Sequence, residues 1–237
     1  MFQQQKGCPL RRDILVRVLP FALFMALIGA EEGLRYLSPY LGLSIGTGAA
    51  VYFYPMKIVA AGLALLYFRK DYDELCFRDL LRPAMTAQSI LAGLAIFILW
   101  INMDWGFARF GPAEAFDPGS IENDTNRALY IATRLFGASV LVPVMEEIFW
   151  RSFLLRYIAN PDFRGVAIGA WALTPFLAIT VLFGLEHNMV AAGLMAGAAY
   201  NLLLFRTRSI AQCVIAHSTT NLALGIYVMM TGSWQFW

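Results

Sequence analysis

Seven long apolar runs, separated by short polar or basic connectors, are the feature that most constrains this chain. They cover residues 14–30, 43–68, 86–107, 128–158, 166–185, 189–205 and 210–230. A helix that crosses the hydrocarbon layer of a membrane needs roughly 20 apolar residues. Hydrophobic residues make up 59% of the chain and charged residues only 14%, whereas soluble domains are about 25% charged. The sequence therefore predicts an all-α, polytopic transmembrane helix bundle of about seven spans, or eight if residues 126–158 contain an extra short helix.

The chain is predicted to form a single membrane-embedded domain over residues 1–237, with its polar motifs confined to a core at about 125–230. The stretch 109–127 is rich in Gly, Pro, Asp and Asn, which is typical of a loop. Cys8, Cys76 and Cys213 lie far apart and show no metal-ligand spacing. The net charge of +2 comes from short basic clusters between apolar runs. This pattern favours a bilayer as partner and argues against nucleic acid.

The basic clusters also predict an orientation. Lys6, Arg11 and Arg12 precede the first run, and further Lys and Arg residues follow the second, fourth and sixth runs. Basic connectors stay on the cytoplasmic side of a membrane. We therefore expect a cytoplasmic N-terminus, a retained first span and an external loop at residues 110–126.

The stretch VMEEIFWR places three charged residues, Glu146, Glu147 and Arg151, inside an apolar run. Glu147 and Arg151 are four residues apart and share one face of a helix. Glu146 points about 100° away from Glu147. The spacing predicts a structural ion pair, Glu147 with Arg151, and one carboxylate left for acid–base chemistry. The alternative is an ion pair that only packs two helices.

Two further motifs hold the two histidines of the chain. FGLEH places Phe183 and His187 on one helix face, so that the ring can support the imidazole. HSTTN places His217 and Asn221 on one face within the last apolar run. Taken singly, each is also compatible with an interfacial histidine or an interhelical hydrogen bond. Polar residues at such depth are costly without partners, and helix lengths allow Glu146 and these residues to line one pocket.

The order and spacing of EExxxR, FxxxH and HxxxN resemble the CAAX prenyl protease and bacteriocin-processing family, also called the CPBP or Abi family, of glutamate-dependent intramembrane endopeptidases. The resemblance covers about residues 125–230. The segments LPFALFMALIGAEEGLRYL and YPMKIVAAGLALLYFRK are similar to the bacterial subgroup associated with exosortase protein sorting. This resemblance implies an integral protein of the bacterial inner membrane.

The resemblance also implies a peptidase mechanism without a metal or other cofactor. Glu146 would activate a water, His187 would help to position or deprotonate it, and His217 with Asn221 would donate hydrogen bonds to the oxyanion. Glu147 and Arg151 would be the structural pair and Phe183 a supporting residue. The substrate would be a membrane-associated protein or peptide. The charge pattern places the pocket in the outer half of the membrane, whereas eukaryotic CAAX proteases face the cytosol, so an exported substrate is expected.

Three alternatives remain. Glu146, His187 and His217 could be ligands of a zinc peptidase, although the usual His-Glu-x-x-His helix is absent. A transporter could use intramembrane Glu, His and Arg as a proton relay, although no internal repeat is visible. A non-catalytic scaffold could retain the motifs.

Overall fold

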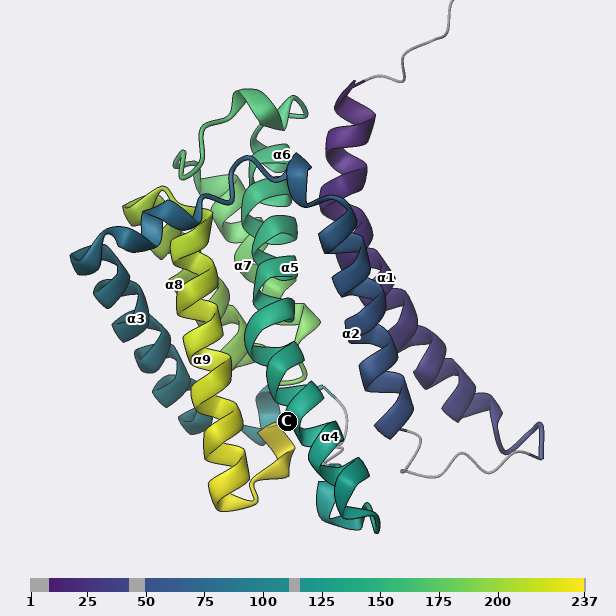
Figure 1. The fold of residues 1–237 in the computed structure, drawn as a ribbon. Coiled ribbons are helices and arrows are strands. Elements are labelled where there is room, and N and C mark those ends of the chain that lie inside the picture. The colour runs from purple at the N-terminus through teal and green to yellow at the C-terminus, as the bar shows by residue number, and fades with distance from the viewer. Residues whose placement is uncertain (1–8, 43–49, 111–115, 237) are drawn as a thin grey trace, which may run out of the picture.

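The predicted apolar runs overlap the helices of the computed structural model, which describes residues 9–42, 50–110 and 116–236 (Figure 1). Residues 43–49 of the second predicted run lie outside the described residues. The helices are α1 (Pro9–Leu37), α2 (Ala50–Tyr67), α3 (Pro83–Asn102), α4 (Asp124–Phe136), α5 (Val142–Glu147), α6 (Leu155–Ala159), α7 (Leu173–Glu186), α8 (Val190–Thr207) and α9 (Ile210–Thr231). Five helical segments are long and apolar enough to span a membrane, and α2 and α7 provide two shorter apolar helices. No β-strand occurs in the described ranges. The all-α, polytopic fold is confirmed.

Helices α4, α5 and α6 join end to end into one continuous rod, residues 124–159, and two π-helical segments connect them. This continuity leaves no separate short helix within residues 126–158. The predicted run 166–185, by contrast, becomes helical only at Leu173. Gly169 adopts a φ of +74° beside the carbonyl of Leu204, where a Cβ would lie 2.8 Å from the oxygen. The backbone therefore turns at Gly169, inside the apolar run, and α7 begins only after this turn. For this reason α7 is shorter than the apolar run.

The rod lies between the α1–α2 hairpin and the group formed by α3, α7, α8 and α9 (Figure 1). Helices α3 and α9 cross closely because Gly93 has no side chain. A Cβ there would lie 2.3 Å from the carbonyl oxygen of Ala216, and the hydroxyl of Thr220 donates to the Gly93 carbonyl at 2.9 Å. Ser209 caps the start of α9, where its hydroxyl accepts from the Gln212 amide. The crossing and the cap fix how α9 is rotated.

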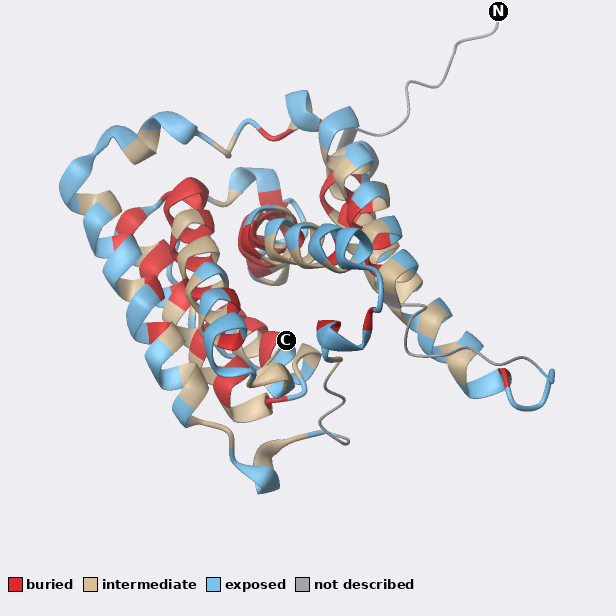
Figure 2. Cartoon of the chain, turned by 60° about the horizontal axis from the view of Figure 1, so that its bottom comes forward, coloured by how far each residue is buried: buried red, intermediate tan, exposed pale blue. Residues whose placement is uncertain are grey.

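Burial follows the pattern expected of a bundle surrounded by lipid. Buried residues gather where the rod, α8 and α9 face one another, and the outward faces of the helices are exposed (Figure 2). Large apolar side chains remain on those faces, among them Leu63, Leu91 and Leu177, each more than half exposed. Contact of these apolar side chains with water is unfavourable, whereas contact with the lipid chains of a bilayer is not.

A buried arginine joins α1 to the connector after α2. Both Nε and Nη2 of Arg17 donate to the Glu74 carboxylate at 2.7 Å, and the Arg17 side chain is fully buried. Glu74 in turn accepts from the hydroxyl of Ser152 on the rod. Arg164 pairs with Asp73 at 2.7 Å, and this contact holds the pKa of the Asp73 carboxyl well below its usual range. One polar cluster thus connects α1, the connector and the rod.

We predict that Arg17→Met strongly destabilises the fold, because the Glu74 carboxylate, 5% exposed, loses both of its 2.7 Å contacts with Arg17 and keeps only Arg164, at 3.6 Å, as a guanidinium partner. Removing one partner of a buried ion pair costs about 3–5 kcal/mol. Thermal unfolding in detergent measures the loss. Arg12→Met is the matched control, because Arg12 pairs with Asp71 from a side chain that is 67% exposed. Equal destabilisation by both substitutions would contradict the prediction.

Candidate active site

The rod presents its two adjacent glutamates between two π-helical segments, Gly137–Leu141 and Ile148–Leu154. Glu146 and Glu147 close α5, the short α-helical segment between them. π-Helical turns are rare and occur frequently at functional sites. Glu146 is 6% exposed and Glu147 is fully buried, so both carboxylates have left water.

Glu147 lies at the centre of a buried charged contact. Its Oε1 accepts from Nη1 of Arg151 at 3.1 Å, and the same oxygen lies 2.9 Å from Nδ1 of His217. The Arg151 guanidinium is stacked 4.4 Å from the ring centre of Phe183 and 5.3 Å from that of Tyr200. The sequence spacing anticipated the contact with Arg151 but not the one with His217. Glu147 therefore orients one histidine as well as neutralising an arginine.

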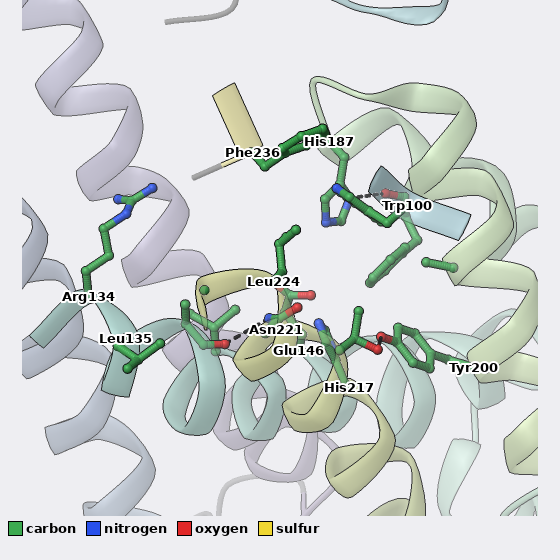
Figure 3. Close-up of a pocket in the computed structure, with 16 residues that line it drawn as sticks. Trp100, Arg134, Leu135, Glu146, His187, Tyr200, His217, Asn221, Leu224 and Phe236 are labelled. Atoms are coloured by element: carbon green, nitrogen blue, oxygen red, sulfur yellow. Dashed lines mark hydrogen bonds between the residues drawn. The ribbon is translucent and has the colours of Figure 1, made fainter. Parts of the chain in front are cut away.

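Glu146 faces a cavity of about 210 Å³ between the rod, α7, α8 and α9 (Figure 3). The cavity is lined by Glu146, His187, His217 and Asn221, and Phe183 also contributes to its wall. Among the described residues, Oε2 of Glu146 has no hydrogen-bond partner. A buried carboxylate oxygen without a protein partner is well suited to hold a water or a substrate group.

His187 follows the last residue of α7 and turns its ring onto that helix. Its Nδ1 lies 2.7 Å from the carbonyl oxygen of Phe183. Because a carbonyl can only accept, Nδ1 carries the proton and Nε2 keeps its lone pair. The ring packs against Phe183, with 4.7 Å between ring centres, and edge-on against Trp100 at 5.3 Å. These contacts fix both the tautomer and the angle of the imidazole.

His217 is held on α9 from two sides. Glu147 accepts from its Nδ1, and the ring of Tyr200 stacks on it with 4.8 Å between ring centres. The phenol of Tyr200 donates to the hydroxyl of Thr220 at 2.9 Å. The His217 imidazole is thereby fixed with Nε2 as its remaining polar atom.

Asn221 lies one helical turn beyond His217. Its Nδ2 donates to the carbonyl of Ala138 at 2.8 Å, and this carbonyl belongs to the first π-helical segment of the rod. A side-chain amide carries two N–H groups. One therefore bridges α9 to the rod, and the other is a donor that the Ala138 contact does not use.

Among the cavity residues that were not anticipated from the sequence are Trp100, Arg134, Tyr200 and Phe236. None of these four residues belongs to a motif of regularly spaced polar residues. The sequence therefore did not indicate that they line the site. Glu186, to which the three motifs assign no role, also interacts with the site. It accepts from Nε1 of Trp150 at 3.1 Å and lies near enough to Glu146 for the two charges to interact.

The zinc alternative requires three ligands grouped around one point. Within the described part of the chain, no three His, Cys, Asp or Glu side chains form such a group. Glu146, His187 and His217 line one cavity but do not meet as a ligand set.

Residues 128–223 match the family described as type II CAAX prenyl endopeptidase Rce1-like. No curated protein and no solved structure matches the chain significantly. The matched residues contain all three motifs and most of the cavity lining. Residues 128–223, the motif-bearing part of this chain, are therefore similar to the Rce1-like family of type II CAAX prenyl endopeptidases.

Proposed function

We propose that this chain is an intramembrane endopeptidase that hydrolyses a peptide bond through a water activated by Glu146. The observation that carries the proposal is the Glu146 carboxylate, buried in a cavity that also holds both histidines and Asn221, with one oxygen lacking a protein partner. The similarity of residues 128–223 to a protease family supports peptide hydrolysis as the reaction class. The hydrogen-bond geometry supports the role that we propose for each residue.

The first step is proton removal from water. Glu146 accepts the proton as general base, and the water oxygen attacks the carbonyl carbon of the scissile peptide. Nε2 of His187 accepts a hydrogen bond from the same water, because Nδ1 of that ring already donates to Phe183. This second acceptor orients a lone pair of the water toward the peptide.

The second step is stabilisation of the negative charge that develops on the carbonyl oxygen. Asn221 supplies the N–H that its Ala138 contact does not use. Donation from Nε2 of His217 needs a proton on both ring nitrogens, since Nδ1 already donates to Glu147. The charge of that imidazolium then lies against the Glu147 carboxylate. Glu146 finally returns its proton to the leaving amine.

The substrate that suits this cavity is a membrane-associated protein or peptide, because the site lies within helices that face lipid. We further propose an inner-membrane protein with a cytoplasmic N-terminus and a cavity in the outer half of the bilayer. The basic connectors support this orientation. Exported proteins would then be the substrates, consistent with the resemblance of the N-terminal segments to the exosortase-associated subgroup.

We predict that Glu146→Gln abolishes cleavage of membrane-bound substrates, because glutamine has the shape of glutamate but cannot accept the water proton. Loss of a general base costs about 10²–10⁴ in rate. His187→Ala should lower the rate too, whereas Glu122→Gln, in the external loop, should not. Cleavage by purified variants in liposomes measures the effect. Activity of Glu146→Gln equal to that of the wild type would refute the proposal.

Asn221→Ala should lower kcat by about 10²–10³ with little change in KM, because the lost donor acts on the transition state. Steady-state kinetics separate the two parameters. Thr219→Ala is the control, since its hydroxyl donates only to the Ile215 carbonyl one turn earlier in α9. A rise in KM at constant kcat would instead assign Asn221 to substrate binding.

Chelation distinguishes the proposed mechanism from the zinc alternative. Because the mechanism requires only Glu146, His187, His217 and Asn221, activity should survive prolonged dialysis against EDTA and 1,10-phenanthroline. Metal content of the same sample, measured by atomic emission, is the companion readout. Loss of activity that zinc restores would replace the glutamate mechanism with the metal mechanism.

A further inference from the structure

The cavity has two chemically different ends. Arg134, on α4, lines one end, and Trp100 with the ring of His187 lines the other. Glu146 and Asn221 lie between them (Figure 3). A substrate bound along this cavity therefore meets a cation on one side of the reacting centre and aromatic rings on the other.

Arg134 is seated by its contacts with α2. Its guanidinium lies 4.8 Å from the centre of the Tyr54 ring, and the Tyr54 phenol donates to the Arg134 carbonyl. Gly137 permits this approach, because a Cβ there would lie 2.7 Å from the Tyr54 hydroxyl oxygen. A guanidinium is planar, and its donors match the geometry of a carboxylate. Stacking on an aromatic ring fixes the orientation of that plane.

The charges within the cavity decide where a substrate carboxylate can lie. Glu146 lines the cavity and Glu186 lies beside it, whereas the charge of Glu147 is balanced by Arg151. A substrate carboxylate near these groups is repelled, whereas one beside Arg134 is attracted. Attraction at one end and repulsion at the centre define a direction for the bound peptide.

The distance between Arg134 and Glu146 along the rod determines how far a carboxylate bound to Arg134 lies from the scissile bond. Twelve residues of helix rise about 18 Å, and both side chains lean toward the N-terminal end of the rod, so the spacing is retained. An extended peptide covers about 3.4 Å per residue. Arg134 is thus about five residues from the scissile bond.

We propose that Arg134 determines specificity by binding a substrate carboxylate about five residues from the cleaved bond. The carboxylate belongs either to a free C-terminus or to an acidic side chain. The inference rests on the proposed function and narrows its substrates to peptides with negative charge at that distance. It adds a binding residue outside the three sequence motifs.

The test uses acylated, quenched fluorescent peptides in liposomes, in two matched pairs. In the first pair, one peptide ends in a free carboxylate about five residues after the cleaved bond and the other ends in an amide. In the second pair, one peptide carries an internal Glu at that distance and the other carries Gln. The wild type should cleave the preferred charged form about 10–100-fold more efficiently, the range of a charge-assisted hydrogen bond. Lower cleavage of the amide form would show that Arg134 binds a terminal carboxylate. Lower cleavage of the Gln form would show that it binds an acidic side chain.

Arg134→Gln should remove this preference and Arg134→Lys should retain part of it. Arg127→Gln is the matched control. Arg127 lies two turns earlier on the same face of α4, pairs with Asp124 and is not part of the cavity lining described above. Thermal unfolding of each variant verifies that it folds, and the comparison of substrate forms by the wild type needs no substitution at all.

Two results overturn the inference. One is equal cleavage of charged and neutral peptides by the wild type, and the other is an unchanged preference in Arg134→Gln. Binding of the same peptides to Glu146→Gln, measured by fluorescence anisotropy, separates this inference from the proposed function. Absence of cleavage by the wild type would refute the proposed peptidase function. Equal affinity for the charged and neutral peptides would refute only the proposed role of Arg134.

Discussion

The buried contact of Glu147 with Arg151 and His217 is the interaction on which the rest of the site depends. Glu147 and Arg151 are fully buried, and an unpaired charge in such surroundings costs several kcal/mol. The Glu147 carboxylate brings His217 of α9 against the rod, and the Arg151 guanidinium packs against Phe183 of α7 and Tyr200 of α8. One charged contact therefore holds four parts of the bundle in register.

Glu146 acquires its distinct role from this arrangement. Because its neighbour takes the arginine and the histidine, Glu146 turns into the cavity with one oxygen lacking a protein partner. π-Helical segments flank α5 on both sides. The carbonyl of Ala138, in the first of these segments, accepts a hydrogen bond from Asn221. The local backbone thus positions the proposed base, and the same backbone anchors a proposed oxyanion donor.

Much of this molecule was predictable because helices are local structures. Apolar runs of sufficient length form helices in a bilayer, since only intrahelical bonds satisfy the backbone there. Four-residue spacing likewise predicted that Glu147 would meet Arg151 and that Phe183 would support His187, and both contacts occur. The start of α7 was predicted seven residues too early, because the left-handed turn at Gly169 has no signature in an apolar run.

The sequence by itself determined the helices, the pairs that lie one turn apart and the similarity of the motif region to a protease family. Only the tertiary structure decided that His217 binds Glu147, that Asn221 reaches Ala138 and that Arg134 shares a cavity with Glu146. These contacts join residues up to 83 positions apart. They depend on how each helix is rotated about its axis, and that rotation is set by close crossings such as Gly93 against Ala216. A spacing rule within one helix contains no information about the rotation of its neighbour.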